Sequence, residues 1–170
     1  GAIYNDIHSV RLHIDNTTFT GNQALYGNVI ANNGYFGHIT NSTFTSNTNL
    51  SVGSYGGVIY NSRFGSGMEI NSSKFTNNRA EYGGVIYNAD GGSISLLNKV
   101  TAGDAKNSKY QNNASYGGVI YNEGTIDTIT ASVLARNVVT QNGGAIFNAT
   151  TGIINNIVNT NLSYETAERD

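Results

Sequence analysis

Short runs of apolar residues alternate with polar turn residues along the whole chain. The clearest run reads Gly-Gly-Val-Ile-Tyr-Asn at residues 56–61, and exact or decayed copies of it recur. The copies lie at residues 1–5, 27–32, 56–61, 83–88, 117–122 and 143–148. Such runs are short, rich in Val, Ile and Tyr, and bounded by Gly or Asn. They therefore predict strands rather than helices.

A second motif alternates with the first: an aromatic or large apolar residue is followed three positions later by Asn. The leading residues of its copies are Phe19, Phe44, Phe75, Tyr110, Leu134 and Val158. A third, fainter group of spaced apolar positions lies between the two motifs, as at Met68 and Ile70. Each period therefore contains three strand-like segments separated by turns.

The period itself points to a solenoid. The closing Asn residues of the first motif are separated by 27, 29, 27, 34 and 26 positions. Three short strands within such a period are what one coil of a parallel β-helix requires. We therefore predict an all-β fold: a right-handed, single-stranded parallel β-helix of about six coils with three short strands each. Residues 1–162 form the β-helix in this prediction, and residues 163–170 form a polar tail or linker.

Stacking of equivalent positions predicts the interior and the corners. Ile59, Ile86 and Ile120 should form one inward column, and the leading residues of the second motif should form another. The Asn columns should lie at turns, where Asn tolerates a left-handed backbone and its amide can bond the next coil. The Gly before each Val-Ile run permits a sharp bend.

Composition excludes several classes of function. Cysteine is absent, so disulfides, thiolate metal sites and a Cys nucleophile are excluded. Nine Lys and Arg residues in 170, with a net charge of −2, predict no nucleic-acid partner. No apolar run approaches the length of a membrane span. Metal-binding and phosphate-binding motifs are absent, so we expect neither a metal nor a cofactor.

The alternation of the two motifs resembles a known family. Gly143-Gly144-Ala145-Ile146, the Gly-Gly-Val-Ile copies and the Phe-Thr-x-Asn copies are similar to the GGA(I/L/V) and FxxN tetrapeptides of chlamydial polymorphic-membrane-protein repeats. The resemblance covers nearly the whole chain. It implies an adhesin-like autotransporter passenger, exported by a type V route, that is secreted or held at the bacterial outer membrane. Val replaces the Ala of the motif in most copies, and Asn28 replaces one Gly.

Tyrosines form the first candidate binding surface. Tyr60, Tyr87 and Tyr121 each follow an inward Ile, and the two-residue period of a strand directs them outward. A second set precedes the Gly pair at Tyr26, Tyr55, Tyr82 and Tyr116. Such columns can bind sugar rings or protein partners, or they can stack on one another and hold the coils in register.

The longest period supplies the second candidate. It spans 34 residues, and its extra sequence lies around residues 98–109, which include Thr101, Asp104 and Lys106. Insertions in solenoids form loops on one face, which is often the binding face. A smaller insertion occupies residues 49–54.

Carboxylates define an enzymatic alternative. Asp90 and Glu123 follow equivalent Asn residues in neighbouring coils, and together with Asp104 they are the candidate acids of a carbohydrate-active lyase or glycosidase. The simpler interpretation is an exposed charge column in which Arg63 faces Asp90.

We therefore expect a non-enzymatic, adhesin-like surface protein. It would bind a receptor or glycan on a host or neighbouring cell, or a second copy of itself, through side faces and loops. A self-assembling filament subunit or a spacer is a further alternative.

Overall fold

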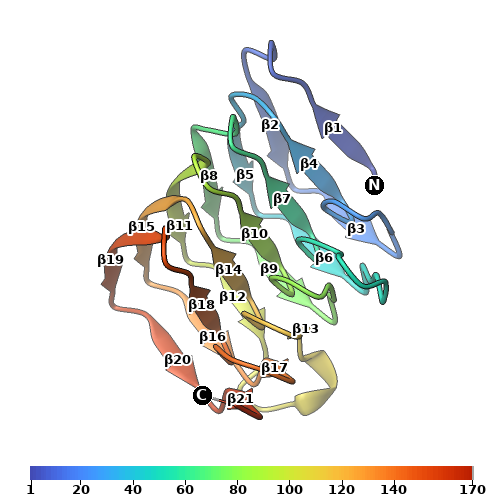
Figure 1. Cartoon of the computed structure of the whole chain (residues 1–170), viewed down its shortest axis with the longest axis vertical. Coiled ribbons are helices and arrows are strands. Elements are labelled where there is room, and N and C mark those ends of the chain that lie inside the picture. The colour runs from blue at the N-terminus through green and yellow to red at the C-terminus, as the bar shows by residue number, and fades with distance from the viewer. Residues whose placement is uncertain (170) are drawn as a thin grey trace.

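A computed structural model describes residues 1–169, which form six stacked coils (Figure 1). The chain passes through three six-stranded sheets in turn, and each coil adds one strand to each sheet. The strand pairs are parallel, with the partner one coil above or below. The predicted parallel β-helix is confirmed.

The three sheets correspond to the three sequence motifs. Sheet A consists of β1 (Ile3–Asn5), β4 (Ile30–Asn32), β7 (Ile59–Asn61), β10 (Ile86–Asn88), β14 (Ile120–Asn122) and β18 (Ile146–Asn148). Sheet B consists of β2 (Leu12–Asp15), β5 (Gly37–Thr40), β8 (Met68–Asn71), β11 (Ser93–Asn98), β15 (Thr125–Thr130) and β19 (Ile153–Val158). Sheet C consists of β3 (Thr18–Thr20), β6 (Thr43–Thr45), β9 (Lys74–Thr76), β12 (Thr101–Gly103), β16 (Val133–Ala135) and β20 (Asn161–Ser163).

A small fourth sheet covers the corner between sheets C and A. It consists of β13 (Asn113–Ala114), β17 (Val138–Val139) and β21 (Thr166–Ala167). Isolated parallel bridges from Thr48 to Arg79 and from Arg79 to Asn113 extend this sheet into the earlier coils. A single 3₁₀ turn, η1 (Ser108–Tyr110), interrupts the fourth coil.

The Ile column of sheet A lies inside, as predicted. Ile59, Ile86 and Ile120 are direct partners in neighbouring strands and are at most 2% exposed. Full burial of such a side chain contributes about 1.5–3 kcal/mol. Ile3 and Ile146, in the first and last strands of sheet A, are partly buried, because each has a neighbouring coil on one side only.

The inward column of sheet C differs from the prediction in two coils. It comprises Phe19, Phe44, Phe75, Ala102, Leu134 and Leu162. The assignment of Tyr110 and Val158 to this column is therefore wrong. Tyr110 precedes an Asn by three positions in the sequence, as the motif requires, only because an insertion separates Ala102 from the next corner. Val158 is the last residue of β19 and belongs to sheet B.

Two columns of Asn side chains join the coils from within. The first comprises Asn5, Asn32, Asn61, Asn88, Asn122 and Asn148, and each Nδ2 donates to Oδ1 of the next Asn at 2.7–2.8 Å. The second comprises Asn22, Asn47, Asn78, Asn112 and Asn137, with donor–acceptor distances of 2.9–3.1 Å. The predicted amide bonding is thus confirmed, although Asn112 occupies the place expected for Asn113.

Left-handed backbone was predicted at the Asn columns, but it occurs at other positions. The corner between sheets B and C has φ of 49–53° at Asn16, Asn41, Ser72, Lys99, Ala131 and Asn159. None of these belongs to an amide column. At Gly83, which opens a Gly-Gly-Val-Ile run, φ is +67° and a Cβ would lie 2.0 Å from the Ile86 carbonyl oxygen. Gly is therefore required at that corner both by conformation and by space.

The ladders extend beyond residue 162, the predicted end of the β-helix. Leu162 and Ser163 pair with β16, and Thr166 and Ala167 pair with β17. Residues 163–167 therefore complete the sixth coil, whereas Asp170 of the expected tail lies outside the described residues.

Candidate binding surfaces

Two aromatic columns lie side by side on the outside of sheet A and on the corner that precedes it. Together they form a tyrosine face that comprises Tyr26, Tyr55, Tyr82 and Tyr116 in one column and Tyr60, Tyr87, Tyr121 and Phe147 in the other. Within each column the ring planes differ by 3–17° and the centroids lie 4.9–5.6 Å apart. Between columns the rings meet edge to face at 65–84°.

This packing determines what the predicted binding tyrosines present to a partner. Tyr60 and Tyr121 are half-buried, but Tyr87 is only 8% exposed, so its predicted exposure is wrong. The cause is that Tyr60 and Tyr121 stack on its two faces while Tyr55 packs edge to face against it at 4.8 Å. Ring faces inside the columns are thus occupied, and ring edges and hydroxyls remain available.

Three tyrosines of the second column have raised pKa values. Burial raises the pKa of the Tyr60 and Tyr121 phenols, and the nearby Glu123 carboxylate adds to both shifts. The pKa of Tyr87 is raised furthest, by burial first and then by the hydrogen bond that its hydroxyl donates to Glu123. Tyr60 and Tyr121 therefore offer neutral hydroxyl donors at any physiological pH.

The long insertion is shorter than the sequence suggested. Thr101 belongs to β12, where the next residue, Ala102, is fully buried in the core. The loop proper comprises residues 104–111, and Figure 1 shows this yellow segment projecting from the stack of coils. Asp104 accepts a hydrogen bond from the Lys106 backbone at 2.9 Å and so shapes the start of the loop. Of the predicted loop residues, Asp104 and Lys106 thus lie in the loop and Thr101 does not.

The three candidate catalytic acids do not all converge. Asp90 and Glu123 line one open groove together with Tyr60, Arg63 and Phe64. Asp104 lies beyond both β11 and β12 in the chain, at the far end of sheet C. The Arg63 guanidinium lies over the Phe64 ring at 5.2 Å. Within residues 1–169 the one contact within 4 Å between a basic side chain and a carboxylate joins His8 to Asp6 at 3.9 Å, and the expected pairing of Arg63 with Asp90 is absent.

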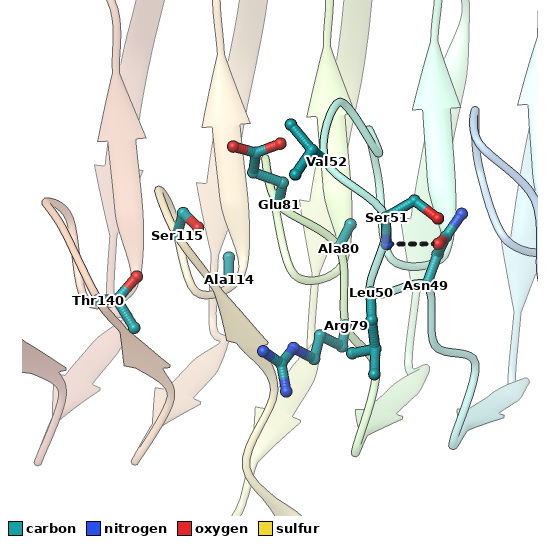
Figure 2. Close-up of a pocket in the computed structure, with 10 residues that line it drawn as sticks. All are labelled: Asn49, Leu50, Ser51, Val52, Arg79, Ala80, Glu81, Ala114, Ser115 and Thr140. Carbon is teal, nitrogen blue, oxygen red and sulfur yellow. Dashed lines mark hydrogen bonds between the residues drawn. The ribbon is translucent and has the colours of Figure 1, made fainter.

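The smaller insertion forms a second groove, shown in Figure 2. Its loop is fixed at both ends: the Ser51 backbone donates to Asn49 at 2.8 Å, and the Gly53 backbone donates to the Glu81 carboxylate. Leu50 and Val52 nevertheless remain 71% and 89% exposed. The groove volume of about 140 Å³ is below the roughly 300 Å³ at which ligand pockets begin. It therefore accommodates single side chains rather than a whole ligand.

A histidine pair on sheet B was not predicted. His13 and His38 are direct partners on β2 and β5, and their ring centroids lie 3.8 Å apart. Desolvation lowers the pKa of His13, and His38 and Arg11 lower it further. The signal in the sequence is a His-Ile pair that recurs after one period.

No cluster of three His, Asp or Glu able to hold a metal occurs within the described residues. These residues also contain no helix that is long and apolar enough to cross a membrane.

Comparison with known families recognises one coil of this architecture. Residues 72–95 match the Chlamydia polymorphic membrane protein repeat. The chain is similar to this repeat over 24 of its 170 residues. The matched segment contains the Phe75 strand of sheet C, the Gly83–Gly84 corner and the sheet A strand that follows it. The match thus confirms the resemblance within this coil. Searches of curated proteins and of solved structures found no match.

Proposed function

We propose that the chain is a non-enzymatic passenger segment that mediates adhesion to another cell, or self-association, through its side faces. The proposal rests mainly on the tyrosine face, which continues across several coils without a break. Tyr is enriched in protein interfaces because its ring contributes apolar contact and its hydroxyl contributes a hydrogen bond. Since the ring faces inside the columns are covered, a protein surface fits this strip better than a stacked sugar.

The small insertion strengthens the same side of the molecule. Leu50 and Val52 are exposed on a loop that leads directly into Tyr55 of the tyrosine face. Fixed loops that carry uncovered apolar side chains lose little conformational freedom on binding. We therefore expect this loop to contribute a central contact of the adhesive surface.

A cell-binding assay tests the proposal. The purified chain, coated on beads, should bind host or bacterial cells or cause the beads to clump. Replacing Leu50 and Val52 with Ser should reduce this binding at least fivefold, since burial of each side chain on binding contributes roughly 1.5–3 kcal/mol. Ser replacement of Val10, which is 87% exposed between β1 and β2 of the first coil, is the matched control. Adhesion that survives the Leu50 and Val52 change would refute the proposed surface.

The groove of Tyr60, Phe64, Asp90 and Glu123 favours a second candidate. Its volume of about 600 Å³ lies within the range of small-molecule sites, and its two carboxylates face the same space. A carbohydrate-active enzyme could use them as an acid and a base. We propose instead that no cleavage occurs, because the Glu123 carboxylate is already engaged by Tyr87. Incubation with pectin, alginate and hyaluronan should release no reducing ends. Cleavage that disappears in the Glu123→Gln variant would establish the enzyme.

A further inference from the structure

Stacking of the coils gathers most of the positive charge on one edge. Six of the nine Lys and Arg residues lie on or beside the insertion, and we call them the basic edge: Lys74, Arg79, Lys99, Lys106, Lys109 and Arg136. They come from three successive coils. Their spacing along the chain therefore gave no sign of a cluster.

Contacts place four of these residues around the insertion: Lys74, Lys106, Lys109 and Arg136. The Lys74 ammonium lies over the ring of Tyr110, at the end of the insertion, with 5.6 Å to the ring centroid. The Arg136 Nε donates to the carbonyl of Ala105, at the start of the insertion, at 2.7 Å. The insertion, which also carries Lys106 and Lys109, is therefore held between a cation of the preceding coil and one of the following coil.

The two remaining cations extend the edge. Lys99 is the corner residue before β12, and the insertion leaves from the other end of that three-residue strand. The length of β12 thus separates Lys99 from the insertion by roughly 13 Å along the strand direction. Arg79 bridges to Asn113, just after the insertion, and Figure 2 shows its side chain extended towards the neighbouring coil.

Carboxylates are fewer than cations along this edge, where Glu81 lines a groove with Arg79 and Asp104 lies in the insertion. None of its six cations forms an ion pair within the part of the chain that the structure describes. The outer face of sheet C beneath it carries neutral residues beside Lys74, such as Thr43, Thr101 and Val133. Asp104 is the acid of the insertion itself, and its carboxylate accepts from the Lys106 backbone. A local excess of positive charge therefore exists on a chain whose net charge is −2.

We propose that the basic edge binds a linear sulfated polysaccharide. This inference rests on the proposed adhesive function and names a ligand class for the insertion. Sulfate groups keep their negative charge at any physiological pH, and Lys and Arg bind them through charge-assisted hydrogen bonds. An extended chain of sugars spans the separation between Lys99 and the insertion. Nucleic acid fits less well, because single-stranded bases need free aromatic faces, whereas Tyr110 and Tyr164 lie beneath Lys74 and Arg136.

Binding of a size-defined heparin oligosaccharide to the purified full chain tests the proposal. The wild-type chain should bind at 50 mM NaCl, and its affinity should fall steeply as salt is raised. Changing Lys74, Lys106 and Lys109 to Gln should weaken binding roughly tenfold or more and reduce the salt slope by about two to three. The matched control changes Arg11, Arg63 and Arg169 to Gln. It removes the same number of charges outside the basic edge and should bind within about twofold of wild type.

Several results would overturn the inference: no heparin binding at 50 mM NaCl, equal losses in both triple variants, equal binding of desulfated heparin, or tighter binding of duplex DNA. A parallel cell-adhesion assay separates this inference from the proposed function. A chain that adheres to cells without binding heparin overturns the inference alone. A chain that binds heparin through the basic edge without adhering to cells supports the inference and refutes the proposed function.

Discussion

The carboxylate of Glu165 takes the place of an Asn side chain at the end of the second amide column. Its Oε2 accepts from the Asn137 backbone at 2.6 Å, and its Oε1 accepts from the Asn137 Nδ2 at 3.2 Å. Asn137 receives the same two types of hydrogen bond from Asn112, through its own Oδ1. The last coil is thus joined by an ionisable group where the others are joined by neutral amides.

Because a carboxylate stands here in place of an amide, the stability of the last coil should depend on pH. Burial raises the pKa of Glu165 from 4.5 to about 7, against the smaller opposing effect of the Asn137 hydrogen bonds. The folded state therefore holds the proton more tightly than the unfolded state, and this group's stabilisation is lost as pH rises from 4.5 to 7. Glu165→Gln should protect the amides of β20 and β21 at pH 8 and change little at pH 4.5. Hydrogen exchange measures this, and an identical pH profile in both proteins would contradict it.

The buried amide columns should be costly to interrupt. Asn88 accepts from Asn61 and donates to Asn122, both at 2.8 Å. Asn88→Leu keeps the size of the side chain but removes the acceptor of the Asn61 amide and the donor to the Asn122 Oδ1, both of which are buried. We expect a loss of about 2–5 kcal/mol in the free energy of unfolding. Urea denaturation measures it. Asn155→Leu, at an exposed strand position, should cost less than about 0.5 kcal/mol.

The second Gly of the Gly pair should be limited by space rather than by conformation. A Cβ at Gly84 would lie 2.3 Å from the carbonyl oxygen of Gly118, and φ at Gly84 is not positive. Gly84→Ala should therefore destabilise the chain by about 1–3 kcal/mol or more through overpacking. Gly53 is the complementary case, with φ of +76° and nothing near a Cβ. Gly53→Ala should cost about 1–2 kcal/mol. Thermal melts compare the two, and a harmless Gly84→Ala would show that the coils can move apart.

The second column of the tyrosine face ends at Tyr60, and a substitution in the preceding coil should extend it. Ala31 stands in the column of Tyr60, between Tyr60 and Tyr4. Ala31→Tyr would place a ring against Tyr60 and should stabilise the chain by about 0.5–1.5 kcal/mol. A raised melting temperature measures the gain, and Ala31→Ser is the control for a change at this site without a ring. A lower melting temperature for the Tyr variant would show that the second coil cannot accept the column.

The repeat made most of the fold predictable, because in-register stacking turns sequence period directly into contacts. The Ile column and the first Asn column needed nothing beyond the spacing of identical runs. The errors arose where the period changes: Tyr110 was mistaken for the aromatic position because the insertion precedes the corner at Asn112. The burial of Tyr87 was missed because strand alternation alone does not reveal a second aromatic column packed edge to face against it.

The candidate surfaces were less predictable than the fold. Asp90 and Glu123 lie in one groove because their positions follow equivalent residues of the repeat, whereas Asp104 lies apart because it belongs to a loop. The basic edge escaped prediction for a different reason. Its cations occupy non-equivalent positions of three coils, and only the folded path of the insertion brings Lys74 and Arg136 to the same loop.

The identical runs at residues 56–61, 83–88 and 117–122 occupy equivalent places in consecutive coils. A genetic exchange between two of these runs would add or remove one whole coil. The Ile and Asn columns would rejoin across the new junction, because each coil presents the same residues above and below. The length of the rod would change by about 4.8 Å per coil, the spacing of paired strands. The length of such a molecule can therefore change in evolution by recombination, while the Ile and Asn columns of its interior are kept.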